Sequence, residues 1–235
     1  MSHRMLNIVM SIGTALLIGG CSSFNRPYPN KALYAIALGT TPGGSTVPEV
    51  SPARPLAPIL RVKGIRIAKP FDTTSFVYKV GESRFMTDYY NGFIAEPDRL
   101  LTGELVKWLV ASGEFGSVVE EGSTADYRLT LECNVTQLYG DYTNKKSPQA
   151  VMELKIFVID DVPAASRVIF QKTYRQVQPL PDNTPEKLVR GWDEAYRGIL
   201  TQFMSDLRSS PRVANAGLGR QSEWIQQENF AHARR

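Results

Sequence analysis

The sequence predicts an α+β domain in which a mostly antiparallel sheet carries two helices packed on one face, a two-layer sandwich. Stretches with apolar residues at about every second position recur over residues 59–93 and 116–177, and polar or glycine-containing turns separate them. Only residues 97–112 and 184–207 repeat apolar side chains at steps of three and four. Because so few helices cannot connect a fully parallel sheet, hairpins are expected to join most strands.

The strands follow from alternation and from the residues that interrupt it. Residues 39–58 contain five prolines and are expected to form a loop. Gly64 shifts the alternation and predicts a bulge, and Gly81 begins a short turn that is typical of a hairpin. The expected strands are residues 31–38, 59–67, 74–80, 83–93, 116–120, 125–138, 150–159 and 166–177.

Both helices carry start signals, and the first also carries a stop signal. Pro97 suits the first turn of the first helix, and Gly113 suits its C-terminal cap. Thr184 provides a capping hydroxyl for the second helix, and Pro185 occupies its first position.

The N-terminus has the pattern of a secretory signal peptide. Arg4 precedes an apolar run over residues 5–18, and two glycines then lead to Cys21. This run is shorter than the roughly 20 residues that a transmembrane helix needs, so we expect residues 1–20 to be removed by cleavage between Gly20 and Cys21. An uncleaved N-terminal anchor is the alternative.

The four residues before the expected cut, Ile18-Gly19-Gly20-Cys21, resemble a bacterial lipobox. The resemblance implies that Cys21 is lipidated and anchors the mature chain through several acyl chains, such as palmitate. Ser22 stands where an aspartate would favour the inner membrane, so the expected location is the periplasmic face of the outer membrane. We therefore expect a lipidated tether over residues 21–30, a single domain over 31–208 and a flexible C-terminal tail over 209–235.

Composition argues against an enzyme. The chain has two histidines: His3 lies in the signal peptide and His232 lies in the tail, so histidine-based catalysis and a histidine-ligated metal have no rigid support. Cys133 alternates with apolar residues and is expected to be buried, without a disulfide. No catalytic residue, metal site or cofactor is predicted, and a formal net charge of +4 is too small to predict nucleic-acid binding. Three acidic residues are expected to be solvated loop charges: Glu82, Asp88 and Glu96.

Two groups of aromatic residues are candidate partner contacts. Tyr89, Tyr90 and Phe93 cluster at the end of one strand, where alternation can bury only some of them; the alternative is that they belong to the core and the hairpin. Trp224 and Phe230 lie in the C-terminal tail, for which a disordered segment without a partner is the alternative.

Several segments resemble one family when taken together. They are residues 34–38 (YAIAL), 60–67 (LRVKGIRI), 76–78 (FVY) and 89–97 (YYNGFIAEP), the last running into the first helix. Across residues 30–208 the chain resembles the ABC-type transport auxiliary lipoprotein component family, including the lipoprotein of the paraquat-inducible MCE-type system.

The resemblance implies a non-catalytic partner of ABC transporters with MCE subunits, which move phospholipids or other apolar molecules between membranes. Assembly as a homo-oligomer is left open. The alternative function is a structural or scaffolding envelope lipoprotein that carries no cargo.

Overall fold

The structure is a computed structural model that describes residues 30–39, 57–162 and 165–217. Two compact units are distinguished, residues 1–31 and 32–235, and the fold below is that of the second unit. The predicted signal peptide, the cleavage position Gly20, the lipidation site Cys21 and the candidate contacts Trp224 and Phe230 lie outside the described residues.

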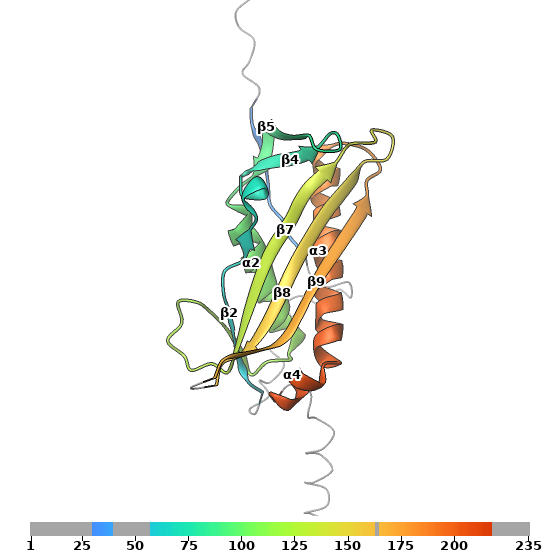
Figure 1. The fold of residues 1–235 in the computed structure, drawn as a ribbon. Helices are drawn as coiled ribbons and strands as arrows, with labels where there is room; N and C mark the ends of the chain where they lie inside the picture. Colours follow the sequence, from blue (N-terminus) through green and yellow to red (C-terminus); the bar gives the residue numbers. More distant parts are fainter. Residues whose placement is uncertain (1–29, 40–56, 163–164, 218–235) are drawn as a thin grey trace, which may run out of the picture. The chain divides into compact units, whose positions relative to one another are not determined.

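Three long strands form the main part of a nine-stranded sheet in the described residues (Figure 1). They are β7 (Leu129–Asp141), β8 (Gln149–Asp160) and β9 (Arg167–Pro179), and each pairs with the next in antiparallel register. Alternation buries one side chain in two against the helices, as for Leu129, Leu131 and Cys133. The predicted hairpins between these strands are present.

The other edge of β7 is covered by a chain segment that runs parallel to it in three pieces. These are β2 (Ile59–Val62), β3 (Arg66–Ile67) and β4 (Ser75–Lys79), with the short 3-10 helix η1 (Lys69–Phe71) before β4. The break between β2 and β3 falls at Gly64, where a bulge was predicted.

Three further strands extend the sheet beyond this interrupted edge. β6 (Ser117–Glu120) pairs with β2 in parallel, and β5 (Phe85–Phe93) pairs with β4 as the predicted antiparallel hairpin. β1 (Ala32–Tyr34) runs parallel to β5.

The expectation of a mostly antiparallel sheet is wrong. Among the described residues five of the eight strand pairings are parallel, and the sheet is mixed and curled (Figure 1). A single helix, α2 (Pro97–Ser112), lies between hairpin β4–β5 and β6, and the other parallel pairings join segments that are far apart along the chain. Alternation shows which face of a strand is buried, but it does not show which strand becomes the neighbour.

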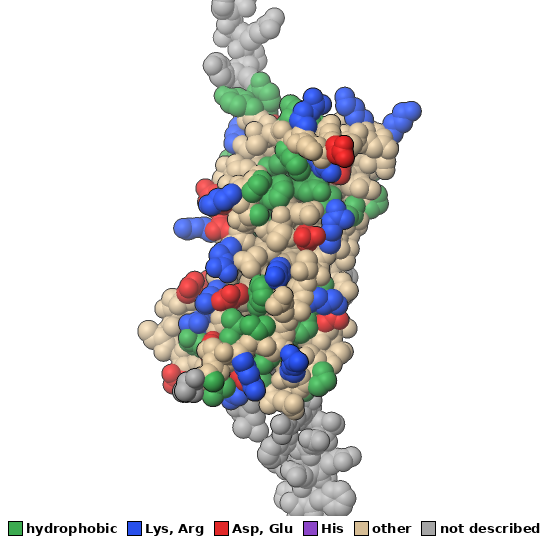
Figure 2. All heavy atoms as spheres, viewed as in Figure 1, with side chains coloured by type: hydrophobic (Ala, Val, Ile, Leu, Met, Phe, Trp, Pro, Cys, Tyr) green, Lys and Arg blue, Asp and Glu red, His purple; other side chains and the backbone are tan. Residues whose placement is uncertain are grey.

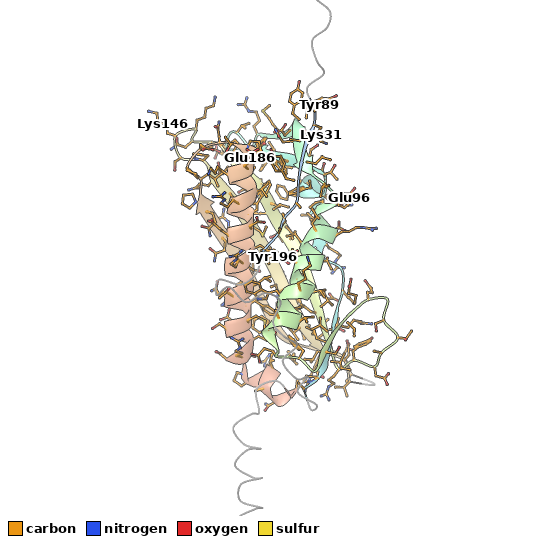
Figure 3. The ribbon with its side chains drawn as sticks, turned by 180° about the vertical axis from the view of Figure 1, so that it is seen from behind. Lys31, Tyr89, Glu96, Lys146, Glu186 and Tyr196 are labelled. Atoms are coloured by element: carbon orange, nitrogen blue, oxygen red, sulfur yellow. The ribbon has the colours of Figure 1, made fainter. Side chains whose placement is uncertain are left out.

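Both predicted helices pack on the same face of the sheet (Figure 3). α2 has the predicted bounds and ends at Gly113, which adopts the left-handed φ of 64°. α3 (Pro185–Arg208) packs on β8 and β9, and the hydroxyl of its Tyr196 donates to the carbonyl oxygen of Leu101 in α2 at 3.0 Å. The α+β class and the helices against the sheet are therefore confirmed.

Gly191 allows α3 to approach the sheet closely. A Cβ at this position would lie 2.6 Å from Leu180 Cδ2 and 2.7 Å from Ala150 Cβ. Any side chain here would push α3 away from β8.

The ordered fold continues past α3. α4 (Pro211–Asn215) lies within residues 209–235, for which we predicted a flexible tail, and its Val213 is fully buried. Among the helices of the described segments, none combines the length and the apolar character needed to cross a membrane.

Candidate binding surface

β5 contains a bulge that presents two of the predicted contact residues. Thr87 pairs with Val77 and Gly92 pairs with Ser75, so one residue of β4 lies opposite four residues of β5, 88–91. We name residues 88–91 the tyrosine bulge. Because the extra residues cannot all pair across the ladder, their side chains leave the regular alternation of the strand.

A single carboxylate holds the tyrosine bulge in place. Asp88 Oδ1 accepts the backbone N–H of Tyr90 at 2.8 Å and of Asn91 at 3.1 Å. Asp88 Oδ2 accepts the hydroxyl of Tyr78 at 2.7 Å and Asn91 Nδ2 at 2.9 Å. Our expectation that Asp88 is a solvated loop charge is therefore wrong: four donors converge on it and fix the backbone that carries the tyrosines.

The charge of Asp88 is stabilised in this position. Partial burial acts to raise the pKa of its carboxyl, but the bonds from Tyr78, Asn91 and the backbone outweigh burial and hold the pKa below its ordinary value. Tyr78 is itself supported by the ring of Tyr142, which stacks on it with centroids 4.9 Å apart.

Tyr89 and Tyr90 are presented to solvent. Their exposed fractions are 75% and 48%, and their rings meet edge to face with centroids 5.1 Å apart. Figure 3 shows Tyr89 projecting from the end of the domain at which α3 begins. Exposed aromatic rings on a fixed backbone can bind a partner with little loss of conformational entropy.

Phe93, the third predicted contact in this group, is a core residue. Its side chain is 4% exposed, and its ring lies 4.9 Å from Phe76 and 5.4 Å from Trp192 between centroids. Beyond the bulge β5 returns to regular pairing, and this turns Phe93 toward α3. The prediction of Phe93 as a surface contact is corrected on this ground.

A second feature fixes the start of the unit to both helices. Residues 34–39, which we name the N-terminal segment, continue from β1 and pass between α2 and α3 (Figure 3). The backbone N–H of Ala37 donates to Asp193 Oδ1 at 3.1 Å, and that of Leu38 donates to Glu104 Oε2 at 3.0 Å. Arg197 donates to the carbonyl oxygen of Leu38.

Apolar packing adds to these bonds. Ile36 and Leu38 are each 2% exposed and belong to the same core as the helices. The strand predicted over residues 31–38 is thus a three-residue strand followed by an extended segment in the helix layer. Burial raises the pKa of the Asp193 carboxyl to about 7, although the Ala37 N–H and the Arg197 charge favour its ionised form.

The free cysteine of the described residues is not placed for catalysis. Cys133 is buried, and burial raises the pKa of its thiol to about 12, so it is not a ready nucleophile. Within the described ranges no group of three or more histidine, cysteine, aspartate or glutamate side chains could hold a metal ion. A pocket of about 220 Å³ lies at the break between β2 and β3. Two of the charged side chains that line it, Lys63 and Glu132, form an ion pair with each other at 2.5 Å.

Sequence reasoning missed the residue that organises the surface. The signal was the spacing of Asp88 and Asn91 around two tyrosines, because Asp and Asn side chains favour turns by bonding to nearby backbone N–H groups. The alternation of the surrounding residues obscured it.

Comparisons with known proteins agree on the fold. No protein-family model matches the chain, and no curated protein matches its sequence. The crystal structure of protein XCC0632 from Xanthomonas campestris, of family DUF330, matches with a TM-score of 0.57 and 16% identity, over 63% of this chain and 83% of that chain. The crystal structure of an uncharacterized protein matches with a TM-score of 0.53 and 14% identity, over 74% and 99%.

A PelC dodecamer from Paraburkholderia phytofirmans also matches, with a TM-score of 0.38 and 14% identity over 64% of this chain and 88% of that chain. That likeness is too distant to carry an argument. The first match shows that this chain shares its fold with the DUF330 protein, and neither of the first two matches indicates a catalytic family.

Proposed function

We propose that this chain is a non-catalytic outer-membrane lipoprotein, an auxiliary component of an ABC/MCE-type intermembrane transport system that acts by binding partner subunits. The observation that carries the proposal is the fold shared with the DUF330 protein, because DUF330 is the ABC-type transport auxiliary lipoprotein family. The segments quoted from the sequence resemble the same family.

Two further observations support this function. Residues 18–21 resemble a lipobox, and in this proposal they supply an anchor at Cys21 on the periplasmic face of the outer membrane. The tyrosine bulge provides a rigid exposed surface, while the buried Cys133 offers no reactive thiol in the folded unit. In this proposal the cargo is a phospholipid or another apolar molecule, and the chain positions transporter subunits rather than transforming the cargo.

Capture from native envelopes tests the proposal. The full chain with a C-terminal tag is purified from envelopes that are solubilised in mild detergent, and its bound proteins are identified by mass spectrometry. An unrelated outer-membrane lipoprotein with the same tag and expression level is the control. We expect enrichment of a permease, an ATPase or an MCE subunit with this chain and not with the control.

Two results would contradict the proposal. If no transporter component is captured although a known transporter complex survives the same detergent, the transport assignment is wrong. Capture of envelope structural proteins without any transporter subunit favours the scaffolding alternative.

A further inference from the structure

Exposed apolar side chains are concentrated at the end of the domain that carries the tyrosine bulge. Among the described residues nine large hydrophobic side chains are exposed, and six of them lie on β1, on β5 or directly after β5: Leu33, Phe85, Met86, Tyr89, Tyr90 and Ile94. Figure 2 shows hydrophobic side chains gathered at the end where Figure 1 labels β5. We name Leu33, Met86, Tyr89, Tyr90 and Ile94 the apolar end.

Strand pairing explains why Leu33 and Ile94 face outward. Tyr34 pairs with Phe93, and Tyr34 and Phe93 both pack their rings on Phe76 in the core. Their neighbours Leu33 and Ile94 therefore point to the opposite side. The exposed fractions of these neighbours are 52% and 62%, so both leave apolar surface uncovered by the domain.

Hydrogen bonds fix the backbone at two places in the apolar end. The four bonds to Asp88 hold the tyrosine bulge, and the backbone N–H of Ile94 donates to the carbonyl oxygen of Tyr34 at 2.8 Å. An exposed group of apolar side chains on a hydrogen-bonded backbone is typical of a binding site.

The path of the chain indicates what covers this surface. Ten residues, 22–31, separate Cys21 from β1, and ten extended residues span at most about 35 Å. The chain enters the unit at β1, which contributes Leu33 to the apolar end. Directly after Leu33, the N-terminal segment is fixed to α2 and α3, so no further residues can lengthen the tether.

We infer that the apolar end rests on the phospholipid bilayer that holds the anchor, with the tyrosine bulge in the headgroup region and the aliphatic side chains of Leu33, Met86 and Ile94 at the acyl boundary. This inference rests on the proposed function only for the anchor at Cys21. Tyrosine suits the interface because its ring is apolar and its hydroxyl bonds to water and headgroups, and aliphatic side chains gain free energy by leaving water. A short tether to the same bilayer raises the effective concentration of lipid at this end.

Fluorescence quenching in vesicles tests the inference. The mature chain with its acyl anchor is reconstituted into vesicles of phosphatidylethanolamine and phosphatidylglycerol, with and without bromine atoms near the tops of the acyl chains. Tyr89→Trp places a reporter in the tyrosine bulge. The emission of the unsubstituted chain, which has three tryptophans, is subtracted.

Val168→Trp is the matched control. Val168 is 48% exposed and lies on β9, where it pairs with Ile159 near the end of β8. The tyrosine bulge lies at the opposite end of the sheet, where β8 begins near Ala150. Nine residues of strand place the two ends about 30 Å apart. We expect bromine to reduce the emission added by Tyr89→Trp about twofold, as for a side chain at the interface, and to leave that of Val168→Trp unchanged.

Three outcomes would overturn the inference. The first is equal emission from Tyr89→Trp with and without bromine. The second is a change in the emission added by Tyr89→Trp that appears only as the protein density on the vesicle rises, because this result assigns the surface to a second copy of the chain. The third is a change in this emission only when solubilised transporter subunits are added, because this result assigns the apolar end to a protein partner.

Failure of the inference can be told apart from failure of the proposed function. Capture of transporter subunits does not depend on the quenching result. If mass spectrometry finds no acyl chains on Cys21, the proposed anchor is wrong. In that case Tyr89→Trp and Val168→Trp are mixed with vesicles in solution. Stronger quenching of Tyr89→Trp than of Val168→Trp would then show that the apolar end binds lipid without the anchor, and equal quenching would show that it does not.

Discussion

The two parts of β5 place aromatic residues in opposite environments within five positions of each other. Phe93 lies in the core and meets Phe76 and Trp192 with centroids 4.9 and 5.4 Å away, while Tyr89 is 75% exposed. The first environment is held by apolar packing, and the second is held by a carboxylate that bonds the backbone beneath the rings. The difference shows that an aromatic side chain on one strand can serve stability or contact, depending on whether the ladder is regular at that residue.

The largest expected effect lies in the buried part of β5. Phe93→Ala removes a ring from between Phe76 and Trp192 and is expected to lower the free energy of unfolding by about 3–5 kcal/mol, as for aromatic truncations in protein cores. Urea denaturation followed by circular dichroism measures this loss. A loss below about 1 kcal/mol would show that Phe93 is not part of the packed core.

The next effect concerns the hydroxyl group that supports Asp88. Tyr78→Phe removes the bond to Asp88 Oδ2 and is expected to cost about 1.5–3 kcal/mol, the range for a hydrogen bond to a charged group.

Tyr142→Phe is the matched control, because the ring of Tyr142 stacks on Tyr78 but its buried hydroxyl has no hydrogen-bond partner among the described residues. We expect Tyr142→Phe to be neutral or stabilising. Equal losses from the two variants would mean that the rings, and not the bond to Asp88, support the bulge.

Acid is expected to weaken the tyrosine bulge through Asp88. The pKa of this carboxyl is lowered in the folded state, so its contribution to stability is complete above the ordinary pKa of 3.8 and is lost as pH falls through the folded-state value. Asp88→Asn removes this titration. Urea denaturation at several pH values between 2 and 7 should therefore show a smaller loss of stability on acidification for Asp88→Asn than for the unsubstituted chain.

Glu82→Gln changes an exposed carboxylate in the adjacent turn and serves as the control for this pH series. We expect its curve to follow that of the unsubstituted chain. If Asp88→Asn also follows that curve, Asp88 does not support the bulge through its charge.

The smallest effect on stability is expected at the exposed tyrosines. Tyr89→Ser and Tyr90→Ser should each change the free energy of unfolding by no more than about 0.5 kcal/mol, because neither ring packs on the core. The same denaturation assay measures both variants. A loss as large as that of Phe93→Ala would remove the contrast between the two parts of β5.

The sequence predicted the elements well because their signals are local. The bounds of α2 were correct, since Pro97 and Gly113 mark its ends, and the apolar spacing of α3 predicted its buried face. The hairpins β4–β5, β7–β8 and β8–β9 were also correct, because each has a short turn between alternating strands.

The parts that were not predicted depend on contacts between distant residues. Nothing local shows that β2, β3 and β4 align in parallel along β7, because that pairing joins residues more than sixty positions apart. The same limit applies to Asp88: its charge is visible in the sequence, but its bond to Tyr78 depends on the register of the hairpin. Tyr89 and Tyr90 were named as contacts, whereas Phe93 was misassigned because the bulge changes the alternation between them.

The route of the N-terminal segment also determines where a force on the chain acts. Its bonds to Asp193 on α3 and to Glu104 on α2 join one length of chain to both helices, and Tyr34 donates to Glu186 at the start of α3 at 2.7 Å. A torque applied through the N-terminus is thus shared by the whole helix layer instead of acting on a single hinge next to the sheet. A pull on the chain at β1 therefore loads both helices of the domain at the same time.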